Sequence, residues 1–163
     1  MEINVQKQHN PKVWSNPVHF LAFGFGSGLA PKAPGTFGTL AAIPVFFGLS
    51  FLSIWAYLLI TAAVCICGIW ICGKTSKDMG VHDHSGIVWD EIAGYLITMI
   101  YIPNKLWCIA LGFALFRFFD ILKPWPISFL DKKIEGGLGI MLDDIAAGIF
   151  SLVIMQITIK IFL

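Results

Sequence analysis

Residues 117–144 read RFFDILKPWPISFLDKKIEGGLGIMLDD and form a polar island between two apolar runs. The island contains the only arginine of the chain and five of its ten acidic residues. Charge at the depth of a bilayer costs several kcal/mol unless it is paired, hydrated or bound to a cation. Acidic residues that border apolar runs therefore indicate a functional requirement, and we expect the island to form the cytosolic floor of an active site.

The composition predicts one integral membrane domain. The chain has 163 residues, 57% of them hydrophobic, and a mean hydropathy of +0.79, which is too apolar for a soluble domain. We expect residues 1–163 to form a single domain that begins with a cytosolic amphipathic arm, residues 1–17, and has no cleavable signal peptide. A net charge of +1 with a single arginine argues against a nucleic-acid partner. The four cysteines lie in apolar runs and are expected to be packing residues.

Apolar runs and helix breakers predict the helices. Residues 18–29 are too few to cross about 30 Å of hydrocarbon and predict a re-entrant or interfacial segment. The uncharged residues 40–72 exceed one crossing, so we place a bend at 49–53 and a full helix over 54–72. The remaining elements are a polar loop at 74–86 and helices at 87–102, 106–119 and 145–163. The predicted fold is all-α, a compact polytopic membrane helix bundle with about four to five spanning or re-entrant helices and an interfacial cytosolic segment.

The order of crossings predicts that acidic residues from three separate elements meet at one face. If the loop at 74–86 is cytosolic, the next helix leaves the cytosol and the one after it returns. The island then stays on this side, and the last helix begins there. Nine of the eleven Lys and Arg residues lie inside in this arrangement, in agreement with the positive-inside rule. The acids that meet are Asp90, Glu91, Asp120, Asp143 and Asp144, the last two at the start of their helix.

These carboxylates repel one another in a half-apolar setting, so some of them must take up protons or share a cation. Hard oxygen ligands without histidine on the same helices favour Mg²⁺. The alternative is that each acid caps a helix or pairs with Arg117 or Lys123. Capping accounts for Asp90 or Asp143 singly, but not for two adjacent pairs together with Asp120. The predicted metal ligands are therefore Asp90, Glu91, Asp120, Asp143 and Asp144.

Two further segments are candidates for binding an anion. Residues 30–39, APKAPGTFGT, interrupt the apolar pattern and place Pro34, Gly35 and Thr36 near the start of the next helix, where free N–H groups favour a phosphate. An ordinary loop explains these residues equally well. His84, the last residue of a His-Asp-His segment, suits a substrate-binding or general-acid role, although a solvated loop is at least as good an interpretation.

A carboxylate site for a hard metal beside lysine and arginine suits phosphoryl chemistry. The metal would polarise a phosphate and activate water, Arg117 and Lys123 would offset charge on the phosphate oxygens, and an acid would take the proton of the water. No cysteine is followed six positions later by arginine and no D-x-D is present, which argues against covalent schemes. The residues predicted to carry the chemistry are Asp90, Glu91, Asp120, Lys123, Asp143 and Asp144.

Four segments together resemble the signature blocks of the phosphatidylglycerophosphatase A family. They are APKAPGTFGT, VHDHSGIVWDEIAG, FRFFDILKPWPI and GGLGIMLDDIAAG, and with GFGSG ahead of the first the likeness extends over residues 16–148. The resemblance implies a Mg²⁺-dependent, multi-pass phosphatase of the bacterial inner membrane with its active site at the cytosolic face. Such an enzyme removes the terminal phosphate of phosphatidylglycerophosphate, a phospholipid, to give phosphatidylglycerol. The acidic and basic positions of the family pattern fall on WDE, FDxxKP and DD.

Other functions remain open from the residues alone. A phosphatase of another membrane lipid, such as a polyprenyl phosphate, would need the same groups. A small transporter that uses intramembrane carboxylates would place acids near mid-span and on both sides, whereas the acids here are expected at one face. A CDP-alcohol phosphotransferase would need a D-G-x2-A-R run, which the sequence lacks.

Overall fold

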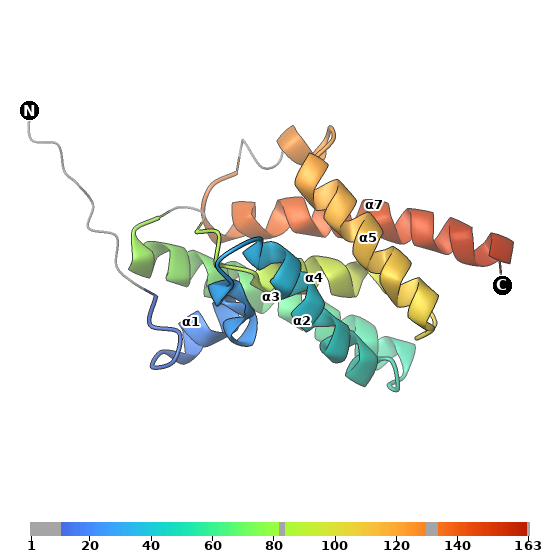
Figure 1. Ribbon diagram of the computed structural model, residues 1–163, viewed down its shortest axis with the longest axis horizontal. Helices are drawn as coiled ribbons and strands as arrows, with labels where there is room; N and C mark the ends of the chain where they lie inside the picture. Colours follow the sequence, from blue (N-terminus) through green and yellow to red (C-terminus); the bar gives the residue numbers. More distant parts are fainter. Residues whose placement is uncertain (1–10, 82–83, 130–133, 163) are drawn as a thin grey trace, which may run out of the picture.

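A computed structural model shows the chain as a bundle of helices (Figure 1). The structure describes residues 11–81, 84–129 and 134–162. All regular secondary structure within these ranges is helical, which confirms the predicted all-α class. The elements are α1 (Pro17–Ala22), the 3-10 helix η1 (Gly24–Leu29), α2 (Pro34–Leu49), α3 (Ile54–Met79), α4 (Trp89–Thr98), α5 (Leu106–Leu122) and α7 (Gly136–Phe162).

Proline, serine and glycine set the ends of α2 and α3. Pro34 is the first residue of α2. The backbone N–H at this position makes no intrahelical hydrogen bond, so proline, which lacks the N–H, costs none there. The chain bends between the two helices, as predicted, and the Ser53 side chain caps α3. α3 stops at Gly80, which adopts the left-handed conformation (φ 68°). The helix is longer than predicted, because the polar residues 74–79 continue it instead of forming a loop.

The last helix begins earlier than predicted. It starts at Gly136 and not at residue 145, so Asp143 and Asp144 lie about two turns inside it and the prediction that they begin the helix is wrong. Glycine explains the difference, because a Cβ on Gly137 would collide with a backbone carbonyl of α3. Small residues that let backbones approach closely favour helix packing in membranes, so a glycine-rich stretch that resembles a breaker is helical here.

α4 is the central helix of the bundle. It contacts α2, α3, α5 and α7 and lies among them in Figure 1, and nine of its ten residues are buried. Neighbouring helices hold it by hydrogen bonds: the Tyr57 hydroxyl of α3 donates to the Leu96 carbonyl (2.7 Å), and the Tyr95 hydroxyl donates to the Ile109 carbonyl of α5 (3.2 Å). These contacts hold the second half of α4, the helix whose first turn carries two of the predicted ligands.

Two helices, α3 and α7, are long and apolar enough to cross a membrane. With 26 and 27 residues they extend about 39 and 40 Å. Their outer faces expose large apolar side chains, such as Leu59 and Ile66 on α3 and Ile157 and Ile161 on α7, as expected for contact with lipid. α2, α4 and α5 have 16, 10 and 17 residues, fewer than the roughly 20 that a crossing requires. The number of four to five spanning or re-entrant helices therefore stays a prediction.

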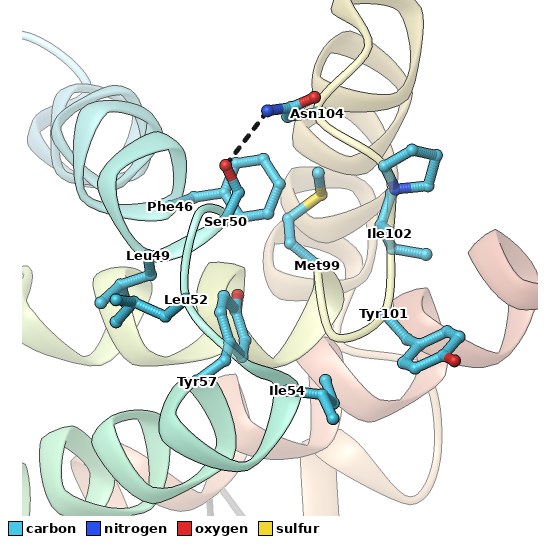
Figure 2. Close-up of a pocket in the computed structure, with 11 residues that line it drawn as sticks. Phe46, Leu49, Ser50, Leu52, Ile54, Tyr57, Met99, Tyr101, Ile102 and Asn104 are labelled. Carbon is cyan, nitrogen blue, oxygen red and sulfur yellow. Dashed lines mark hydrogen bonds between the residues drawn. The ribbon is translucent and has the colours of Figure 1, made fainter.

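A cavity of about 220 Å³ lies where α2 ends, α3 begins and the chain turns after α4 (Figure 2). At its rim the Asn104 side-chain amide donates to the Ser50 hydroxyl (3.2 Å), and the rings of Phe46 and Tyr57 line it. None of the described residues that line it is acidic, lysine or arginine. The charged residues of the core are thus gathered at the other end of α4.

Candidate functional site

The structure brings all five predicted carboxylates to one cleft, as the order of crossings predicts. The cleft has a volume of about 390 Å³ and is formed by the first turns of α2 and α4, the end of α5 and the N-terminal part of α7. Its charged lining consists of Asp90, Glu91, Arg117, Asp120, Lys123, Asp143 and Asp144.

Three of the carboxylates form a tight trio. One oxygen from each of Asp90, Glu91 and Asp144 lies within 4.8 Å of the other two. Oε2 of Glu91 and Oδ2 of Asp144 are buried and have no hydrogen-bond partner among the described residues. Such buried acceptors are unfavourable by about 1–3 kcal/mol each, and by more when charged. A cation among them would satisfy these oxygens, and an all-oxygen donor set is the one that Mg²⁺ prefers, so the residues present fit the predicted metal.

Arg117 and Lys123 hold the remaining two carboxylates. Nη1 of Arg117 donates to Oδ2 of Asp120 and lies 3.8 Å from Oε1 of Glu91. Nζ of Lys123 donates to Oδ2 of Asp143. Lys123 ends α5 in the left-handed conformation (φ 41°), and backbone strain of this kind in a residue with a side chain concentrates at functional sites. Asp120 and Asp143 therefore lie outside the trio, each in an ion pair.

Burial changes the acidity of the site. Glu91 lies on α4, which is too short to span a membrane. Loss of hydration raises the pKa of Glu91 to about 8, and the neighbouring charges of Asp144 and Asp120 act in the same direction. A hydrogen bond with Asp90 and the positive charge of Arg117 lower the pKa and offset part of this rise. Burial therefore favours the protonated form of Glu91.

The first turn of α2 forms one wall of the cleft. Pro34 and Gly35 line it and Thr36 does not. A Cβ on Gly35 would lie 3.0 Å from Nη1 of Arg117 and 3.2 Å from Cδ of Glu91, and closer still to Oε1 of that carboxylate. The missing side chain of Gly35 therefore leaves the space in which these two charged groups sit. Phosphate binding by residues 34–36 stays a prediction.

His84 lies outside the cleft. Its Nδ1 accepts a hydrogen bond from the amide of Gly86 (3.0 Å), and it is not among the described lining residues. Its neighbour Ser85 does line the cleft. No feature of the sequence singles out Ser85 beyond its place in the segment VHDHSGIVWDEIAG. The other two residues of the His-Asp-His segment, 82–83, lie outside the described part of the chain.

Comparison with known proteins decides the family. The sequence model of the family described as phosphatidylglycerophosphatase A matches residues 20–159, which is most of the chain. The chain belongs to this family. The resemblance seen in the four sequence blocks is thereby confirmed, as is the prediction of an enzyme of the phosphoric monoester hydrolase class.

Relatives agree with the family model. A phosphatidylglycerophosphatase A from Escherichia coli (strain K12) is 52% identical over 139 residues, which are 84% of this chain and 80% of that protein. The enzyme of the same name from Haemophilus influenzae is 51% identical over 142 residues, 86% of this chain and 87% of that protein. A Bacteroides thetaiotaomicron protein, provisionally named phosphatidylinositol-3-phosphatase, is 37% identical over 142 residues, 82% of this chain and 88% of its own. No solved structure matches the chain.

Proposed function

We propose that this member of the phosphatidylglycerophosphatase A family hydrolyses the terminal phosphate monoester of phosphatidylglycerophosphate to phosphatidylglycerol, with Mg²⁺ and water. The observation that carries the proposal is the single cleft in which carboxylates from α4, α5 and α7 meet Arg117 and Lys123. The two relatives named for this activity, at 52% and 51% identity, support the substrate.

The proposed metal ligands are the trio Asp90, Glu91 and Asp144, whose oxygens are already clustered, and Asp120 and Asp143 line the same cleft. The ion, when bound, polarises the phosphate and lowers the pKa of water. The trio offers it three of its ligands from two helices, so both helices must be in place before the site exists.

The chain supplies the other elements of hydrolysis. Arg117 and Lys123 place positive charge beside the phosphate oxygens, where negative charge develops. Asp120 and Asp143 line the cleft outside the trio, so either carboxylate is positioned to accept the proton of the attacking water. The water oxygen bonds to phosphorus, the ester P–O bond breaks, and the carboxyl group that accepted the water proton returns it to the departing glycerol oxygen. The dipole at the N-terminus of α2, which begins at Pro34, favours the anionic group that enters.

We also propose that the protein is a multi-pass protein of the bacterial inner membrane and that the cleft opens to the cytosolic face. α3 and α7 are long and apolar enough for two crossings, and the excess of Lys and Arg that the sequence predicts on the cytosolic side supports this orientation. Ile121 lines the cleft and is 65% exposed. An apolar side chain at the rim suits a substrate whose tails stay in the leaflet while its phosphate enters the cleft.

The test uses the full-length protein purified in detergent. It is offered phosphatidylglycerophosphate, phosphatidic acid, phosphatidylinositol 3-phosphate and a polyprenyl phosphate, first with Mg²⁺ and then with EDTA, and released phosphate is measured. We expect Mg²⁺-dependent release that is fastest with phosphatidylglycerophosphate. A preference for another substrate would replace the proposed lipid, and release that persists in EDTA would remove the metal mechanism.

Two observations bear on the alternatives. The provisional name of the Bacteroides relative favours a second lipid phosphate as substrate, which the third lipid in the assay tests. A transporter needs ionisable groups along its path, but the described residues that line the cavity at the far end of α4 include no acid, lysine or arginine (Figure 2). This distribution favours a lipid phosphatase.

A further inference from the structure

The crossing of α4 and α7 depends on two glycines next to the acidic trio. A Cβ on Gly148 of α7 would lie 2.5 Å from the carbonyl oxygen of Gly94 on α4. A Cβ on Gly94 would lie 2.7 Å from the carbonyl oxygen of Asp144. Real Cβ atoms essentially never approach other atoms within 3.0 Å, so only glycine permits this separation of the two backbones.

On each of the two helices, one acid of the trio and one of these glycines lie on the same face. Asp90 precedes Gly94 by four residues, and Asp144 precedes Gly148 by four residues. Residues four apart lie on one helix face, one turn from each other. The glycine contact therefore sets the backbone separation one turn away, at the level where the carboxylates of Asp90 and Asp144 face each other.

We propose that Gly94 and Gly148 are positioning residues that set the size of the cation held by the trio and thereby favour Mg²⁺ over Ca²⁺. The proposal rests on the proposed function, because it assumes the metal site described above. Ligand oxygens on opposite sides of Mg²⁺ lie about 4.2 Å apart, and those on opposite sides of Ca²⁺ about 4.6–5.2 Å. The trio oxygens all lie within 4.8 Å of one another, a limit that admits the Mg²⁺ spacing and excludes the wider part of the Ca²⁺ range.

A small change in helix separation therefore decides which ion fits. Alanine at position 148 must move its Cβ from 2.5 Å to beyond 3.0 Å from the Gly94 oxygen, a shift of about half an ångström between the helices. The distance between ligand oxygens on opposite sides of the ion differs between Mg²⁺ and Ca²⁺ by roughly 0.4–1.0 Å. The shift is thus of the size that separates the two ions, and its direction favours the larger one.

The test compares Gly148→Ala with the wild type in detergent, by thermal denaturation over a range of Mg²⁺ and of Ca²⁺ concentrations. We expect the apparent affinity for Mg²⁺ to fall roughly 10–100-fold, as for other changes that disturb the support of metal ligands, while the affinity for Ca²⁺ falls less or rises. The longer side chain of Asp144→Glu, added to Gly148→Ala, is expected to recover part of the Mg²⁺ affinity.

Two glycines serve as matched controls. A Cβ on Gly48 meets nothing within 4 Å, so Gly48→Ala should keep both affinities. A Cβ on Gly112 would lie 2.5 Å from Sδ of Met99, at the opposite end of α4 from the acids. Gly112→Ala should therefore lower the melting temperature without changing the ratio of the two affinities, which separates a structural defect from a change in ion choice.

An unchanged ratio of Mg²⁺ to Ca²⁺ affinity in folded Gly148→Ala overturns the proposal. If Gly148→Ala does not fold, the wild type decides, since equal stabilisation by the two ions would overturn the proposal in the same way. The proposed function fails separately, if the wild type releases no phosphate from any lipid although its ion preference and the shift in Gly148→Ala are observed.

Discussion

Gly35→Ala tests whether the first turn of α2 shapes the active site. Alanine is favoured over glycine within a helix by up to about 1 kcal/mol, so helix propensity alone predicts a more stable protein. The new Cβ would, however, lie 3.0 Å from Nη1 of Arg117 and inside the contact distance of Oε1 of Glu91. Favourable contacts between heavy atoms lie near 3.5–4.0 Å, so the Glu91 carboxylate must move by roughly 1 Å.

A displacement of about 1 Å at a catalytic group lowers the rate by roughly 100-fold, so we expect kcat/KM of Gly35→Ala to fall by about that factor. Phosphate release from phosphatidylglycerophosphate at saturating Mg²⁺ measures the effect. Gly48→Ala lies on the same helix, adds the same methyl group in open space and should keep wild-type kinetics. If both variants have the same kcat/KM, Gly35 does not leave space for Glu91 in the working enzyme and the reasoning is wrong.

Three further changes separate chemistry from stability. Asp144→Asn should lower kcat by a thousandfold or more, because the metal contributes several kcal/mol to transition-state stabilisation and each ~1.4 kcal/mol changes the rate tenfold. The melting temperature of this variant should no longer rise with Mg²⁺, and a normal rise would contradict the ligand assignment. Lys123→Ala removes the ion pair with Asp143 and should lower kcat by roughly 100–1000-fold, whereas an unchanged kcat would exclude Lys123 from the transition state. His84→Ala should keep kcat/KM but lose roughly 1 kcal/mol of stability, because the hydrogen bond with Gly86 is removed. Denaturation and activity are measured in parallel, and a large loss of activity would show that His84 belongs to the active site.

The convergence of the acids was predicted from the sequence on the assumption that two successive helices cross the membrane and return. On that assumption the end of α5 and the first turn of α4 lie on the same side, whatever the details of packing. Asp120 therefore lies with Asp90 and Glu91 in one cleft. The bend before α3 was predictable for a similar reason, since an uncharged run longer than one crossing must turn.

The helix boundaries at the two long helices could not be predicted in this way. α3 continues through residues 74–79 because Gly80, and not the end of the apolar run, stops it. α7 starts at Gly136 because Gly137 packs against α3, and this contact between distant segments has no local sequence signal. The sequence did not single out Ser85 as a cleft residue, because its place in the lining depends on where the loop before α4 lies, which is set by tertiary packing.

The central position of α4 has a consequence for how the protein is made. Ten residues with two adjacent acids in the first turn do not insert stably into hydrocarbon without partners. One of the helices that enclose α4, α7, leaves the ribosome after it. In the nascent chain, α4 therefore stays only partly covered by other helices until α7 has been synthesised. Chains that terminate before α7 should be inactive and should be degraded by membrane proteases, so that the cell accumulates only molecules whose synthesis was completed.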